Sequence, residues 1–246
     1  MCIRDRFNTF RAAPVKQLEP HIVSLLEHKP VDFLEIFPGY GELTLRVHEA
    51  GCSVADGMDR SRITYGRTWH LDKAEDQSDV AWMIIFVLKP KVIHLGTPCT
   101  KQCVAGSREI DAATESMNEF TRKILQYQAI IGLYASVENP KGSLIFGPTS
   151  WLKNFGRQGN WQAGEGNWRF HEADGCQLKC VYPGDDDEGA PHRKSQIWLA
   201  NFDLSGLELR CRRPNALAGA SQLSQRTAGS TVKNFVQYTQ RKPLRF

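Results

Sequence analysis

Residues 33–51 constrain the fold more than any other part of this 246-residue chain. The apolar run at 33–37 is typical of a buried strand, and the sequence PGYG at 38–41 follows it as a turn that requires unusual backbone angles. From Glu42 apolar residues recur at helical spacing up to Gly51, which suits a left-handed helix end. Strand, glycine turn and helix form half of a βαβ unit, whose turn lets a nucleotide-like ligand approach the backbone.

A second short strand is predicted at 53–58, ending at Asp59. An acidic residue at this position is typical of sites that bind the ribose hydroxyls of a cofactor. The dinucleotide-binding pattern needs a third glycine, and Thr44 occupies the matching position, which disfavours NAD. The pattern favours another adenosine derivative as ligand. An ordinary glycine turn without a ligand is the alternative that this stretch alone leaves open.

The remaining elements alternate between strand and helix. Helices are predicted at 18–26, 80–87 and 110–131, and strands at 91–95, 134–137, 176–181 and 196–201, with a further strand ending at Leu71-Asp72. The alternation predicts a Rossmann-like α/β fold with a mostly parallel sheet and helices on both faces. Ligands bind such sheets at the C-terminal strand edges, where Gly39, Asp59, Cys99 and Glu138 fall in this prediction.

The chain length fits one domain. Residues 1–16 are expected to be an N-terminal extension outside the fold, and 17–246 the domain itself. Within it, 141–190 is predicted as an irregular insertion rich in Trp and Gly, and 202–246 as a short basic C-terminal region. At least one of Trp151, Trp161 and Trp168 is expected in the core.

Cysteine count and hydropathy predict a soluble intracellular protein. Seven cysteines are an odd number for a disulfide framework, so reduced thiols are expected. No run reaches the roughly 18 apolar residues of a membrane span, and the N-terminus lacks the apolar core of a signal peptide. We expect a monomer, located in the nucleus if the source is eukaryotic and in the cytoplasm if it is a phage or bacterium.

Positive charge is concentrated near the C-terminus, although the net charge is only +4. After Pro191 the only acidic residues are Asp203 and Glu208, against Arg193, Lys194, Arg210, Arg212, Arg213, Arg226, Lys233, Arg241, Lys242 and Arg245. This excess predicts contact with phosphates, and a solvated basic tail is the alternative.

Two loops carry residues suited to catalysis. Cys99 follows Thr97 and Pro98 at a predicted strand end, and a thiol is a good nucleophile because part of it is already thiolate at neutral pH. Glu138, in the sequence ENP, also follows a predicted strand, and a carboxyl there can share or donate a proton. A small buried cysteine and a plain Glu-Asn-Pro turn are the structural alternatives.

Three stretches in this order, FLEIFPGYGE at 33–42, TPC at 97–99 and ENP at 138–140, resemble motifs of the cytosine-5 DNA methyltransferases. The resemblance covers about residues 32–201 and implies a fold that binds S-adenosylmethionine. It implies that Cys99 adds to carbon 6 of a cytosine flipped out of double-stranded DNA, that Glu138 contacts N3 and the exocyclic amine, and that Asn139 holds the loop. It assigns the cofactor site to Phe37, Gly39, Gly41, Asp59, Asp72 and Pro98.

The stretch PHRKSQIW at 191–198 is similar to a later basic motif of the same family, in which a cation contacts the cytosine carbonyl and a nearby phosphate. Arg193 or Lys194 would take this role. The commoner members have Gln-x-Arg-x-Arg here and a second proline in place of Thr97, and this chain is more similar to a divergent branch from phages and eukaryotic mobile elements. Only 202–233 is left for target recognition, which predicts short or loose sequence specificity.

Two other functions remain open. One is the same chemistry on RNA, and the other is a catalytically silent methyltransferase-like module that binds nucleic acid or a partner. The intact Cys99 and Glu138 count against the second. The pairs Cys99/Cys103 and Cys176/Cys180 allow a zinc site, but their spacing is not typical of one, so no metal is expected.

Overall fold

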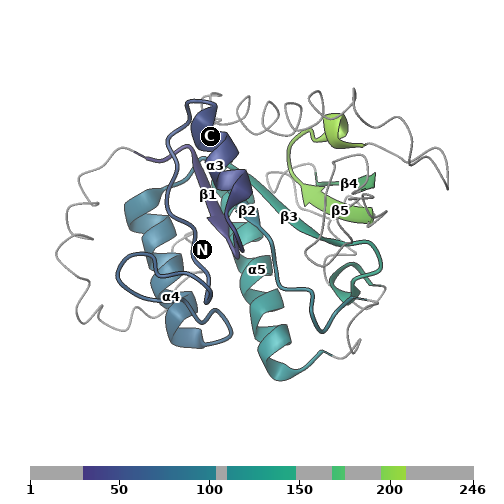
Figure 1. The fold of residues 1–246 in the computed structure, drawn as a ribbon, viewed down its shortest axis with the longest axis horizontal. Helices are drawn as coiled ribbons and strands as arrows, with labels where there is room; N and C mark the ends of the chain where they lie inside the picture. The colour runs from purple at the N-terminus through teal and green to yellow at the C-terminus, as the bar shows by residue number, and fades with distance from the viewer. Residues whose placement is uncertain (1–29, 104–109, 148–167, 175–194, 209–246) are drawn as a thin grey trace, which may run out of the picture.

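The computed structural model describes residues 30–103, 110–147, 168–174 and 195–208, and Figure 1 shows how their elements are arranged. The strands are β1 (Phe33–Ile36), β2 (Val92–Leu95), β3 (Tyr134–Pro140), β4 (Arg169–Asp174) and β5 (Ser195–Ala200). The helices are α3 (Glu42–Glu49), α4 (Ala74–Trp82), which continues as the π-helical turn η1 (Met83–Leu88), and α5 (Ala112–Ile130). Two 3-10 turns, η2 (Leu144–Phe146) and η4 (Ser205–Leu207), complete the set. None of these helices is long and apolar enough to cross a membrane.

The five strands form one sheet in the order β1-β2-β3-β5-β4. β1, β2 and β3 pair in parallel, as the predicted Rossmann-like fold requires, and this fold class is confirmed. β5 runs antiparallel to both β3 and β4, so the sheet is mixed. The helix predicted at 18–26 and the strand predicted at 176–181 lie outside the described residues.

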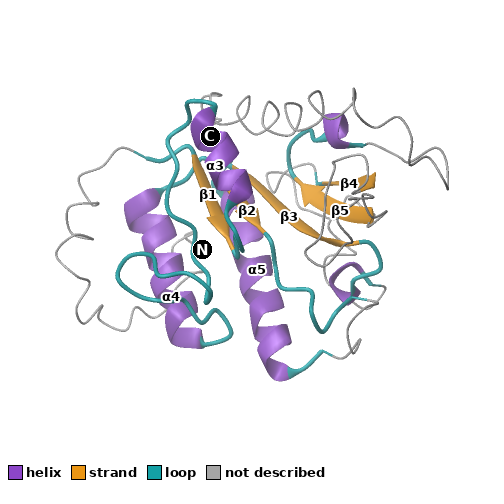
Figure 2. Ribbon diagram, in the orientation of Figure 1, coloured by secondary structure: helices purple, strands orange, loops and turns teal. Residues whose placement is uncertain are grey.

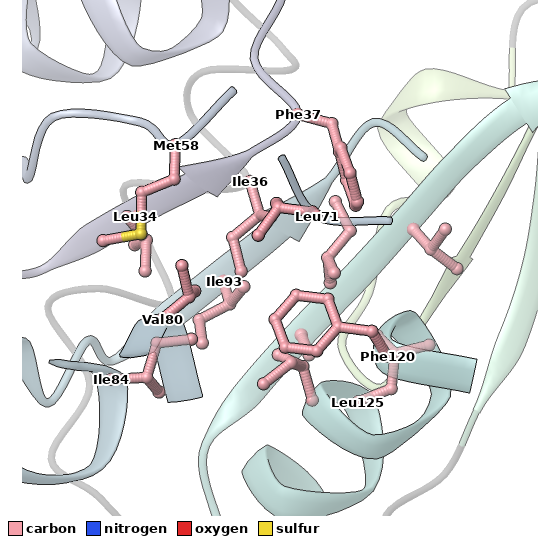
Figure 3. Packing of buried hydrophobic residues seen from close by; sticks show 14 of the residues in the cluster. Leu34, Ile36, Phe37, Met58, Leu71, Val80, Ile84, Ile93, Phe120 and Leu125 are labelled. Atoms are coloured by element: carbon pink, nitrogen blue, oxygen red, sulfur yellow. The ribbon is translucent and has the colours of Figure 1, made fainter. Parts of the chain in front are cut away.

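Helices cover both faces of the sheet, as predicted. Side chains alternate between the two faces along each strand, so both faces carry apolar side chains that the helices bury. Leu34 and Ile36 of β1 join the larger core cluster with α4, η1 and α5. Phe33 of β1 instead packs with Val47 of α3 in a second cluster. Figure 2 shows α3 on the near side of the strands and α5 behind them, and Figure 3 shows Leu34 and Ile36 among side chains such as Phe120 of α5.

β3 is longer than the sequence predicts, and this corrects the position of Glu138. The parallel ladder with β2 ends where Leu95 pairs with Val137. On its other side β3 pairs with β5, from Ser136 to Pro140, and in this pairing Glu138 lies opposite Trp198. Glu138 therefore lies within a strand, past the end of β2, so the predicted end of this strand at 137 is wrong, and the alternative of a plain Glu-Asn-Pro turn is excluded.

Two further predicted strands are wrong in the structure. At 53–58 only Val54 and Met58 form isolated parallel bridges with β1, because these two residues are four positions apart while their partners Phe33 and Ile36 are three apart, so no continuous ladder forms. Leu71 and Asp72 form a turn. In the loop before them the indole of Trp69 donates 3.0 Å hydrogen bonds to the Thr64 carbonyl and hydroxyl oxygens, so local contacts replace a ladder.

β4 is a strand that the sequence does not predict, since 169–174 falls in the stretch expected to be an irregular insertion. Phe170 pairs with Leu199 of β5, and the strand forms the outer edge of the sheet. Trp168, directly before β4, is only 5% exposed and packs in the larger core cluster. The expectation that at least one of the three tryptophans lies in the core is confirmed for Trp168, while Trp151 and Trp161 lie outside the described residues.

Candidate functional site

A pocket of about 480 Å³ lies beyond the C-terminal ends of β1 and β2. Its lining includes Phe37, which directly follows β1, and Pro98, on the loop after β2. Asp59 and Asp72 also line it, so four of the six predicted cofactor residues come together. The volume falls in the range of about 300–1,000 Å³ that is usual for small-molecule sites.

Other lining residues were not predicted from the sequence. Trp69, Leu71 and the α5 residue Met117 supply apolar wall, and Arg60, Lys101 and Asp111 supply charge. Trp69 is 1% exposed and held in place by Arg67, whose guanidinium carbon lies 4.1 Å from the ring centroid. The signal in the sequence is the alternation of Trp69 and Leu71 with the polar residues His70 and Asp72, which predicts the end of a strand rather than a pocket wall.

Asp59 reaches the pocket in a fixed orientation. Its carboxylate oxygen Oδ1 accepts hydrogen bonds from the Ser61 backbone N–H at 2.9 Å and from the Ser61 hydroxyl at 3.0 Å. This is the short-range turn that Asp side chains favour. These two bonds fix the position of Oδ1, and with it the orientation of the Asp59 side chain, before any ligand binds.

Gly39 and Gly41 shape the turn after β1 but do not line the pocket. Both have left-handed backbone angles, with φ of +52° and +74°. The Gly41 N–H donates to the Pro38 carbonyl at 2.8 Å, and the Arg62 guanidinium packs against Gly41 where a side chain would project. Phe37, which does line the pocket, has φ +57°, an uncommon angle for a residue with a side chain.

Glu35 of β1 binds the start of α3. Its Oε2 accepts hydrogen bonds from the Thr44 backbone N–H at 3.1 Å and from the Thr44 hydroxyl at 2.5 Å. Burial raises the pKa of Glu35, while the Thr44 hydrogen bonds and the Arg62 charge oppose the rise. Thr44, where the dinucleotide pattern has glycine, thus connects the helix to the strand.

The loop that carries Cys99 is fixed to β3 and α5. Asn139 of β3 donates to the Thr97 carbonyl at 2.7 Å, which confirms the prediction that Asn139 holds this loop. The Thr97 hydroxyl lies 2.9 Å from that of Thr121 on α5, so threonine at this position has its own anchoring contact. Cys99 is half-buried between Pro98 and Thr100, which both line the pocket, but does not line it itself.

Glu138 lies on the strand next to the Cys99 loop but outside the pocket. β2 and β3 are neighbours, and Glu138 follows the last residue of β3 that pairs with β2. The side chains of Ser136 and Glu138 project to the same face of the sheet, since residues two apart in a strand do so. On that face His94 bonds Ser136 at 2.9 Å and stacks on Trp198, with ring centroids 4.9 Å apart. Arg193 and Lys194 lie outside the described residues.

No protein-family model matches the chain, and no curated protein matches its sequence. Among solved structures the chain is similar to the Dnmt2 methyltransferase of S. pombe, with a TM-score of 0.39 and 13% sequence identity. The match covers 75% of this chain and 52% of the other, so this chain spans about half the length of that structure.

Proposed function

We propose that this chain is an S-adenosylmethionine-dependent methyltransferase that methylates carbon 5 of cytosine in DNA. The observation that carries the proposal is the pocket beyond β1 and β2, lined by Phe37, Asp59, Asp72 and Pro98, with Cys99 next to Pro98 on the same loop. Ligands of parallel α/β sheets bind at this edge. The motif resemblance had assigned the same four residues to a cofactor and Cys99 to the reacting base.

The pocket residues fit the chemical parts of S-adenosylmethionine. Phe37 and Leu71 offer apolar surface for the adenine ring, and the fixed Asp59 carboxylate suits the two ribose hydroxyls. Arg60 supplies positive charge for the carboxylate of the methionine part, whereas the Lys101 ammonium is already paired with the Asp111 carboxylate in the same pocket. When bound, this cofactor supplies an electrophilic methyl group.

Cys99 and Glu138 would act on the cytosine itself. Carbon 5 of cytosine is too electron-poor to accept a methyl group directly, so the Cys99 thiolate adds to carbon 6 and forms a carbon–sulfur bond. Electron density then rises on carbon 5 and N3, and Glu138 provides or shares a proton at N3. Carbon 5 takes the methyl group and releases the demethylated cofactor. Carbon 5 then gives its proton to water, N3 returns its proton to Glu138, and the thiolate leaves carbon 6. The base must be flipped from the duplex to be reached.

The nucleic-acid partner is proposed from the basic C-terminal residues, with Arg193 or Lys194 as the contact to the cytosine carbonyl or a phosphate. Methyl transfer tests the whole proposal. Incubation with labelled methyl donor and matched DNA and RNA of one sequence should yield 5-methylcytosine in the DNA, and Cys99→Ala should abolish it. Label in the RNA alone would move the substrate to RNA, and label in neither would favour a silent binding module.

A further inference from the structure

Gln102 lies on the Cys99 loop and is completely buried, with 0% exposure. All four of its polar groups have hydrogen-bond partners. Its backbone N–H donates to the Cys99 carbonyl at 2.8 Å, and its carbonyl accepts from the Leu144 N–H at 2.8 Å. Its side-chain nitrogen donates to the Pro98 carbonyl at 2.9 Å and to Asn118 Oδ1 at 3.1 Å. Its Oε1 accepts from Asn118 Nδ2 at 3.1 Å.

These bonds connect two other parts of the molecule, α5 and η2, to Cys99 and to the residue directly before it. Asn118, 3% exposed, belongs to α5, and Leu144 belongs to η2, after β3. Through one side chain α5 therefore holds the carbonyl of Pro98, the residue directly before Cys99. The backbone of Gln102 holds Cys99 from the other side.

Packing alone does not explain an amide at this position, because a buried amide is costly unless its groups are bonded and an apolar side chain of similar volume fills space as well. A buried polar network whose members are all bonded gains rigidity and one defined geometry. We propose that Gln102, with Asn118, is a positioning residue that fixes the Cys99 loop for attack on the base. This inference rests on the proposed function, in which Cys99 is the nucleophile.

Gln128 offers a matched control on the same helix as Asn118. It is also 0% exposed, and its side-chain nitrogen also donates to a proline carbonyl, that of Pro90, at 3.0 Å. Pro90 precedes β2, whereas Pro98 follows it, so the two glutamines make similar contacts at opposite ends of one strand. Gln128→Met therefore removes a buried amide with the same kind of proline contact, at the end of β2 away from Cys99.

The test uses duplex DNA that contains 5-fluorocytosine, because fluorine at carbon 5 blocks the final step and traps the covalent adduct. The rate of adduct formation with methyl donor present is measured for the unaltered protein, Gln102→Met and Gln128→Met, and mass spectrometry locates the adduct. We expect the adduct on Cys99 and a roughly 10²-fold slower rate in Gln102→Met, the order of loss caused by a misplacement of about 1 Å. Gln128→Met should match the unaltered rate.

Two further measurements separate an effect on the position of Cys99 from effects on folding and on the reactivity of its thiol. The double variant Gln102→Met/Asn118→Leu replaces both amides by apolar groups and should regain stability, but it should stay slow because the Pro98 carbonyl still lacks its donor. Alkylation of Cys99 by iodoacetamide should not slow in either variant, since the thiol is intact. The double variant also serves as the test protein if Gln102→Met does not fold.

The outcomes distinguish this inference from the proposed function. An adduct formed at the unaltered rate in Gln102→Met or the double variant, or equal slowing in Gln128→Met, would overturn the positioning role alone. An unaltered protein that forms no adduct, or forms it on Cys103, would overturn the proposed function and its nucleophile.

Discussion

Asp59 shows how a single side chain can be prepared for its ligand by a neighbour. Ser61 holds one carboxylate oxygen, so removal of the carboxylate should cost the proposed cofactor its bonds to an already oriented partner. Asp59→Ala should weaken S-adenosylmethionine binding by about 10- to 100-fold, which corresponds to a charged hydrogen bond of about 1.5–3 kcal/mol. Titration calorimetry measures the change. Asp56→Ala, an exposed carboxylate on the same segment outside the pocket, is the control, and equal affinities would contradict the assignment.

Glu138, the proposed proton donor, is half-buried on β3, and the pairing of β3 with β5 fixes its backbone. Glu138→Gln retains the shape and a hydrogen-bond donor but cannot transfer a proton. Methylation should slow by about 10²- to 10⁴-fold, the usual contribution of acid–base assistance, while cofactor affinity stays the same. Steady-state rates and calorimetry measure both. Glu172→Gln, on β4 but on the opposite sheet face, is the control, and a Glu138→Gln enzyme of normal rate would show that the cytosine pocket is elsewhere.

The predictable part of the site was the part in which residues adjacent in sequence act together. Phe37 and Pro98 were found because each lies in a local motif after a strand, and Asp59 was found although the segment before it forms only isolated bridges with β1. Gln102 was missed because its partners Asn118 and Leu144 come from later elements, and no local pattern indicates such contacts.

At the scale of elements, the ends of β1 and β2 approach so closely that only glycine fits between them. The Gly96 N–H donates to the Ile36 carbonyl at 3.0 Å, and a Cβ on Gly96 would lie 2.9 Å from the Phe37 carbonyl oxygen. Phe37, directly after β1, and Pro98, two residues after Gly96, both line the pocket. The pocket wall therefore depends on this contact between two strand ends.

Gly96→Ala should reduce the free energy of unfolding by about 1–3 kcal/mol through overpacking, and should also weaken cofactor binding because Phe37 must move. Gly51→Ala is the control. Its φ of +85° makes it strained, but a Cβ there meets nothing within 4 Å, and Gly51 does not line the pocket. Urea unfolding should show destabilisation in both variants and calorimetry a binding loss in Gly96→Ala only. Unchanged binding in Gly96→Ala would exclude the coupling.

Elements with strong apolar signals could be predicted, and those that depend on distant pairing could not. β1, β2 and α5 follow from apolar runs and helical spacing. The end of β3 and the whole of β4 depend on β5, which comes later in the chain. On α5 the spacing of apolar residues predicts the helix, but it does not predict that polar side chains are buried as well, among them Asn118, Thr121 and Gln128.

At the scale of the whole molecule, His94 makes the fold sensitive to acid. It lies on β2 in the middle of the sheet, and burial lowers its pKa from 6.5 to about 3. The unfolded chain therefore binds a proton between these values that the folded chain does not. The contribution of neutral His94 to stability is complete above about pH 6.5 and is lost as the pH falls toward 3, by about 1.4 kcal/mol per pH unit.

Urea unfolding at several pH values between 7 and 4 tests this dependence. His94→Gln should be less stable at pH 7, because it loses the stack on Trp198, but its stability should fall less steeply with acid. His48→Gln removes an exposed histidine from α3 and should keep the steep fall. Parallel curves for His94→Gln and the unaltered protein would contradict the buried neutral state.

Glu35 has a consequence for which ligands the protein rejects. The first turn of a helix attracts anions, and enzymes that use dinucleotides hold a pyrophosphate there. In this chain the Glu35 carboxylate already occupies the first turn of α3 through two bonds to Thr44, so an incoming phosphate would meet both a filled position and a like charge. NAD and ATP should not displace S-adenosylmethionine, which carries no phosphate, in a competition titration. Glu35 thus competes permanently with phosphate groups for the hydrogen-bond donors of Thr44. The fold itself should therefore exclude phosphate-bearing cofactors from the first turn of α3.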